Sequence, residues 1–182
     1  MSNTETVSKA DVLRYFFDGK VQDPKAQNRQ FYLDLLAIVD DAQFLTAVQS
    51  HWPEDDDNSV VGWTVGTRKF NNSAQVARWT KTEIAVDPIY SKGIDPPVAE
   101  MLEATRGNLK DLAHLLLPQT DWASQNRFQL ERDPGDEFHI IGVRHDSSAH
   151  NGTVELLDGS HRLVALAAKG KTSVKAYIAD LK

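Results

Sequence analysis

The fold of this chain is decided by the stretch Leu156-Leu157-Asp158-Gly159-Ser160-His161-Arg162-Leu163-Val164-Ala165. A strand pattern ends at Asp158, Gly159 permits a tight turn, and apolar residues recur at helical spacing from Leu163. The free N–H groups at the start of a helix attract anions, and Arg162 in its first turn adds a guanidinium suited to phosphate. We therefore expect an anion-binding corner at residues 158–162. A strand–helix turn with Ser160 as the helix N-cap and two solvent-facing basic residues is the structural alternative.

The segments around this corner alternate between strand and helix patterns. Helical stripes cover residues 97–117 and 163–168, and Gly170 closes the second as a left-handed cap. The expected strands are Trp79–Val86, Phe138–Val143, Val154–Leu157 and Val174–Ile178. This order predicts an α+β domain with a mixed sheet over residues 78–182.

Residues 1–77 are expected to form a mainly helical addition. Residues 59–77 are an exception, because their β-branched residues and glycines predict a short strand or hairpin followed by a loop. The acidic run at 54–58 is typical of a solvated loop, with a cation site as the alternative, and marks a lobe boundary. The helical stripes are Val12, Leu13, Phe16 and Phe17, then Phe31, Leu35, Ile38 and Val39, then Leu45, Val48 and Trp52.

Composition excludes several classes of protein. The 182 residues contain no cysteine, so disulfides, thiolate metal sites and cysteine nucleophiles are absent. The net charge of −6 disfavours a bulk electrostatic grip on nucleic acid, although residues 138–182 hold six basic and four acidic residues. Met1–Thr6 has neither a basic nor an apolar leader region, and no apolar run is long enough to span a bilayer, so we expect a cytoplasmic protein without a membrane partner.

Asp158–Ala165, together with the later run Lys169–Ile178, resembles the signature of the ParB/sulfiredoxin superfamily. Members have a strand, a Gly-x-[His/Arg]-Arg turn that opens a helix, a glycine and a further strand. The resemblance covers about 105 of the 182 residues, and it implies a ParB/sulfiredoxin-like mixed sheet with packed helices. Residues 1–77 have no counterpart in it.

The resemblance implies nucleotide binding, with Gly159, Ser160, His161 and Arg162 holding the phosphates of ATP, CTP or another nucleoside triphosphate. Ser160 stands where sulfiredoxins carry a catalytic cysteine, which excludes their repair of sulfinic acid. The expected activity is ATP hydrolysis or phosphoryl transfer, with Mg²⁺ bridging the phosphates and Asp158. His161 can move a proton near neutral pH, and Asp158 can hold the metal, orient His161 or favour the helix N-terminus.

Two other functions remain open. The same scaffold can serve a catalytically silent interaction or inhibitor protein of a plasmid or phage, with a protein partner. A ParB-like DNA-binding nuclease is the other alternative, which the negative charge disfavours.

Other candidate residues have structural interpretations. Glu83 and Asp87 could face the corner as metal ligand or general base if the first strand lies near the motif strand, but an exposed strand acid and an Asp-Pro turn are favoured. A metal cluster of His139, His145, His150 and Asp146 has no recognised spacing, and His139 lies in an apolar strand, where a core histidine with its hydrogen bonds satisfied is favoured. The four tryptophans are scattered, as expected for packing in the core or at a lobe interface: Trp52, Trp63, Trp79 and Trp122.

Overall fold

The computed structural model describes residues 4–23, 28–52, 59–66, 76–86, 89–90, 111, 114–115, 138–144, 154–160, 162–163, 166 and 169–182. The chain divides into two compact units. One consists of Met1–Glu5 with Thr80–Leu181, and the other of Thr6–Trp79 with Lys182. Within the described ranges, no helix has the length and apolar character needed to cross a membrane.

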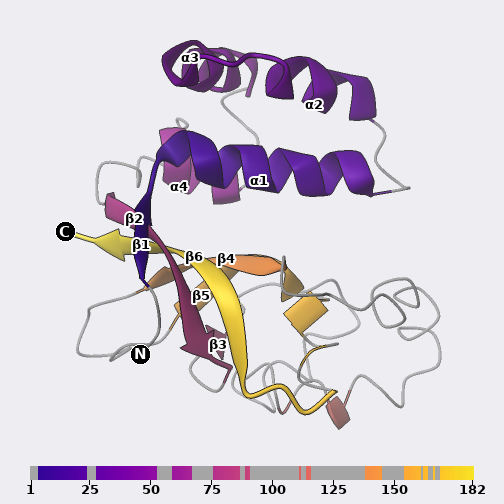
Figure 1. Ribbon diagram of the computed structural model, residues 1–182, viewed down its shortest axis with the longest axis vertical. Coiled ribbons are helices and arrows are strands. Elements are labelled where there is room, and N and C mark those ends of the chain that lie inside the picture. The colour runs from indigo at the N-terminus through magenta and orange to yellow at the C-terminus, as the bar shows by residue number, and fades with distance from the viewer. Residues whose placement is uncertain are drawn as a thin grey trace. The chain divides into compact units, whose positions relative to one another are not determined.

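The unit that spans Thr6–Trp79 is built around α1 (Lys9–Gln22), which packs against α2 (Arg29–Leu36), α3 (Asp41–His51) and α4 (Ser59–Val65). Figure 1 shows α2 lying alongside α1. α1 begins with a capping box, because Ser8 Oγ accepts from the Asp11 N–H at 3.0 Å and Asp11 Oδ2 accepts from the Ser8 N–H at 2.9 Å. The predicted apolar stripe of this helix is confirmed, since all four of its residues are buried: Val12, Leu13, Phe16 and Phe17.

Aromatic rings form the centre of the helical unit. The fully buried Phe17 ring lies 5.3 Å from Trp52, 5.6 Å from Tyr32 and 6.2 Å from Phe44 between ring centroids. Such ring pairs add to the free energy gained from burial alone. The interpretation of the tryptophans as core residues is confirmed for the three that are described, which are at most 9% exposed: Trp52, Trp63 and Trp79. Trp122 lies outside the described residues.

Two expectations for the helical unit are wrong. α2 ends at Leu36, so the expected stripe does not continue through Ile38 to Val39, which is 89% exposed. The expected strand or hairpin after residue 59 is the helix α4. Residues 60–64 of this helix are all buried, and Thr64 Oγ1 donates to the Val60 carbonyl at 2.6 Å. Burial of the helix here outweighs the β-propensity of branched residues.

Six strands of the described chain form one mixed sheet. The strand order is β1 (Glu5–Val7), β2 (Val76–Ala85), β6 (Ser173–Leu181), β4 (His139–Arg144), β5 (Val154–Asp158) and β3 (Ile89–Tyr90). β4 runs parallel to β6 and antiparallel to β5, and β5 runs parallel to β3. With the helices, this sheet confirms the predicted α+β class, and the four expected strands correspond to β2, β4, β5 and β6.

The order of the strands corrects one expectation and locates the corner. The first predicted strand, β2, is separated from the motif strand β5 by β6 and β4, so these two strands are not neighbours. Asp158 is paired with Ile141, and His139 is paired with Lys175. The end of β5 and the beginnings of β4 and β6 therefore meet at one edge of the sheet.

A buried apolar cluster lies along the strands and continues into the segment that follows the corner. Gly170 has a φ of 73°, and the Lys171 N–H donates to the Leu166 carbonyl at 3.1 Å. This is the expected left-handed helix cap. Of the helices expected over 97–117, only Asp111, His114 and Leu115 are described, and they are helical. The acidic run 54–58 lies outside the described residues. The cluster contains Val86, Ile89, Phe138, Ile140, Val154, Leu156, Leu163, Leu166, Val174, Ala176 and Ile178.

Candidate functional site

The strand–glycine–helix turn expected from the sequence is present at the end of β5. Gly159 has a φ of 102°, in the region that L-residues rarely adopt. The Leu163 N–H donates to the Gly159 carbonyl at 2.9 Å, which closes the first helical turn. Gly159 thus takes the cap position and Ser160 is the first helical residue, so the expectation that Ser160 caps the helix is wrong.

The glycine is also required by the space around the turn. A Cβ atom at position 159 would lie 3.1 Å from Ile140 Cγ2, 3.3 Å from Phe138 Cζ and 3.4 Å from Ile140 Cα. Ile140 is fully buried and Phe138 is 7% exposed. The beginning of β4 therefore packs directly against the turn.

The two charged residues that flank the turn bind one another. Arg162 Nη2 lies 3.3 Å from Asp158 Oδ2, and the side chains of Arg162 and Asp158 are 25% and 22% exposed. The Arg162 guanidinium carbon lies 4.4 Å from the centroid of the Phe138 ring. The Phe138 ring and the Asp158 carboxylate together fix the Arg162 guanidinium at the corner.

Asp158 is the residue expected to hold a metal ion, and in this structure its carboxylate faces Arg162. No group of three or more histidine, aspartate or glutamate side chains suited to a metal ion occurs within the part of the chain that is described. Mg²⁺ commonly takes one or two ligands from carboxylates and the rest from phosphate oxygens and water, so a single carboxylate such as that of Asp158 suits this ion. His161, the expected proton carrier, lies outside the described residues.

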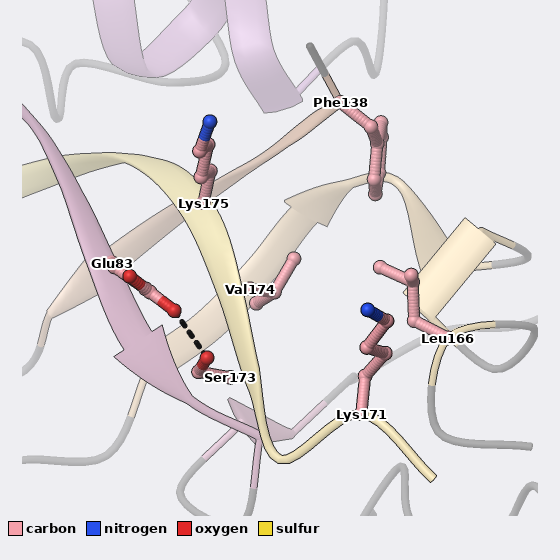
Figure 2. Close-up of a pocket in the computed structure, with 7 residues that line it drawn as sticks. All are labelled: Glu83, Phe138, Leu166, Lys171, Ser173, Val174 and Lys175. Atoms are coloured by element: carbon pink, nitrogen blue, oxygen red, sulfur yellow. Dashed lines mark hydrogen bonds between the residues drawn. The ribbon is translucent and has the colours of Figure 1, made fainter. Parts of the chain in front are cut away.

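A small pocket opens at the same edge of the sheet, with a volume of about 140 Å³. Figure 2 shows Phe138, Val174 and Leu166 as its apolar walls, with the Lys171 side chain directed toward the space between Val174 and Leu166. Lys175 projects from the other side of β6, as expected for the residue next to Val174 in a strand. The Ser173 hydroxyl donates to the Glu83 carboxylate, which completes the lining.

Phe138 connects the pocket with the corner, because its ring lines the pocket and also lies beneath Arg162. Sequence reasoning placed Phe138 in a strand and gave it no role at the site. A signal did exist, since the first residue of one strand lies near the last residue of its antiparallel neighbour. The pairing of the two strands, however, was not specified.

The remaining candidates are distributed as follows. Glu83 is exposed, as the favoured interpretation predicts, and it lies at the pocket rather than against Asp158. His139 is 6% exposed in β4, with its ring 5.0 Å from that of Tyr177, so its expected burial is confirmed, whereas within the described chain its buried Nε2 atom lacks the expected hydrogen bond. The other members of the considered clusters lie outside the described residues: Asp87, His145, Asp146 and His150.

Comparison with known proteins gives no relative of this chain: no family model, no curated protein and no solved structure matches it. The resemblance to the ParB/sulfiredoxin superfamily accordingly stays a prediction.

Proposed function

We propose that this protein binds a nucleoside triphosphate at the Asp158–Arg162 turn, on a ParB/sulfiredoxin-like sheet. The observation that supports the proposal most is Arg162, a half-buried guanidinium fixed on the Phe138 ring in the first turn after Gly159. A helix start supplies N–H donors and a favourable dipole, and arginine supplies a paired donor for phosphate oxygens.

The proposed binding involves an exchange of partners. The Asp158 carboxylate forms an ion pair with the Arg162 guanidinium. On binding, a phosphate group replaces this carboxylate as the partner of Arg162, and Asp158 becomes available to a magnesium ion. Mg²⁺ bound to the phosphates would neutralise charge during ATP hydrolysis or phosphoryl transfer. In this proposal Gly159 and Ser160 contribute to the phosphate turn, and His161 moves the proton.

The pairing of Arg162 with Asp158 also favours a second function. Arg162 binds Asp158 and packs on Phe138 within the chain, so it can stabilise the turn without a ligand. A purely structural role of this kind is expected in a catalytically silent interaction or inhibitor protein. The ParB-like nuclease remains the third alternative, and the net charge of −6 weighs against it.

Thermal unfolding with and without Mg·ATP or Mg·CTP tests the proposal. A ligand that binds only the folded state raises the melting temperature. Arg162→Ala should remove most of the increase, because loss of a charged hydrogen-bond partner weakens binding by about tenfold or more. Arg144→Ala is the matched control, since Arg144 Nη1 forms an ion pair with Asp180 Oδ1 at 3.1 Å elsewhere on the same sheet.

Asp158→Asn separates the proposed roles of the two residues. Without metal, this variant should bind pyrophosphate more tightly than the wild type, because the internal competitor for Arg162 has lost its charge. The variant should also lose the gain in ATP affinity that Mg²⁺ provides. If no nucleotide shifts the wild-type transition, or if the Arg162 and Arg144 variants respond alike, the phosphate assignment is wrong.

A further inference from the structure

We propose that the pocket at the beginning of β6 is a second site, which binds a small monocarboxylate carrying one ring or a short apolar chain. The pocket combines apolar walls with a lysine that points into it, and its occupant differs from the nucleotide proposed for the corner. The proposal does not depend on nucleotide binding.

The size and the walls of the pocket define the apolar part of the ligand. The volume is about 140 Å³, and a cavity of about 150 Å³ is known to hold one benzene molecule. Val174 and Phe138 are 4% and 7% exposed and belong to the core cluster, as does Leu166. A wall that is part of the core keeps its shape when a ligand enters, so a single ring or a chain of similar volume fits without rearrangement.

The charges around the pocket define the polar part. Lys171 supplies one positive charge on the side of the apolar walls, whereas Lys175 projects from the other side of β6, and Glu83 supplies one negative charge. Glu83 accepts a hydrogen bond from Ser173 and is thereby held at the rim. A single carboxylate matches the one ammonium group of Lys171, whereas the two or more charges of a phosphate ester would exceed it and meet the Glu83 carboxylate.

Lys171 is the residue expected to bind the carboxylate. Its side chain extends between Val174 and Leu166 (Figure 2), and no ion pair within the described part of the chain involves its ammonium group. An ammonium above an apolar floor pairs well with a carboxylate whose hydrocarbon portion lies on that floor. Lys175 projects from the other side of β6 and is expected to contribute less.

Titrations of the full chain with benzoate, followed by NMR, test the proposal. Benzamide has the same ring without the charge, and acetate has the charge without the ring. Benzoate should shift the methyl resonances of Val174 and Leu166 and bind about tenfold or more tightly than either analogue. Equal binding of benzoate and benzamide would overturn the charge argument, and shifts confined to other residues, or no shifts, would overturn the site.

Two lysine variants complete the experiment. Lys171→Gln should weaken benzoate binding by about tenfold. Lys169→Gln is the matched control, because Lys169 is exposed two residues earlier, does not line the pocket and carries the same charge. Both variants should leave the melting temperature nearly unchanged, so a loss of binding is not a loss of folding. An equal effect of the two variants would reduce the role of Lys171 to general electrostatics and refute the proposal.

Discussion

Replacement of Gly159 by alanine should destabilise the protein more than the same replacement at Gly170. Both glycines have positive φ, 102° and 73°, and an L-residue in such a conformation costs about 1–2 kcal/mol. At Gly159 the new Cβ would also lie 3.1 Å from Ile140 Cγ2 and 3.3 Å from Phe138 Cζ, whereas at Gly170 no atom lies within 4 Å. The two substitutions therefore differ mainly in steric crowding.

The crowding at Gly159 determines the expected difference. Carbon atoms attract best at separations of about 3.5–4.0 Å, so both contacts are too short. Ile140 and Phe138 are buried and cannot move away without disturbing the core. Overpacking of this kind typically costs 1–3 kcal/mol. Alanine also reduces the entropy of the unfolded chain, but this effect is the same at both sites and cancels.

Urea unfolding followed by far-ultraviolet circular dichroism measures the difference. We expect Gly159→Ala to lower the free energy of unfolding by about 2–5 kcal/mol and Gly170→Ala by about 1–2 kcal/mol. The dependence on urea should be equal for both variants, because neither changes the surface exposed on unfolding. Losses that agree within about 0.5 kcal/mol would refute the packing of β4 against the turn.

Three further predictions concern stability. Arg14 Nη2 lies within 3.1 Å of the carbonyl oxygens of Ile38 and Val39 and of Asp41 Oδ1. Because Arg14→Met removes these hydrogen bonds, it should lower the free energy of unfolding by about 1–2 kcal/mol in urea titrations. An unchanged midpoint would show that the bonds are not formed. Ser160→Ala should lower the free energy of unfolding by less than the roughly 1 kcal/mol of a lost helix cap, because Ser160 follows the cap position. The variant should also keep the nucleotide-induced thermal shift. A folded Ser160→Ala variant without that shift would point to chemistry at the hydroxyl. Removal of residues 173–182 deletes β6 from the interior of the sheet. Gel filtration should find the product aggregated or molten, because the free energy lost with the buried apolar surface exceeds the total stability of a domain, about 5–15 kcal/mol. A folded product would show that the strand order is mistaken.

The corner was predictable from the sequence because its determinants are local. Asp158, Gly159 and Ser160 are consecutive, and a glycine between a strand pattern and a helix pattern has few conformations that join the two. The same holds for the helix cap at Gly170. Both positions have positive φ, and in each case a short stretch of sequence carries the whole signal.

The errors arose where non-local packing outweighs local preference. Val60 and Val61 favour strands, yet they are buried within the helix α4. The three residues of β1 showed no apolar alternation, and they join the sheet as an edge strand, for which little burial is needed. Neither outcome follows from a window of sequence, because each depends on which surface the segment meets.

The partners of Arg162 were unpredictable for a related reason. Asp158, four residues before it, was a candidate metal ligand, and its ion pair with Arg162 competes with that role. Phe138 reaches the corner only because β4 pairs antiparallel with β5, and the register of that pair shifts between Ile141 and Gly142. A shift of one residue moves every side chain of a strand to the opposite face. The ring beneath Arg162 is therefore a consequence of register.

The position of Phe138 determines which substitutions can distinguish the two proposed sites experimentally. Its ring supports Arg162 at 4.4 Å, lines the pocket and lies 3.3 Å from where a Cβ of residue 159 would be. A substitution at Gly159 displaces this ring, so it can weaken ligands at either site without contacting them. Changes at charged groups avoid the ambiguity, because loss of Lys171 should affect the monocarboxylate alone and a change at Asp158 the phosphate alone. If each acts on both ligands, the corner and the pocket form one site divided by a ring, and a single ligand occupies both sides of it.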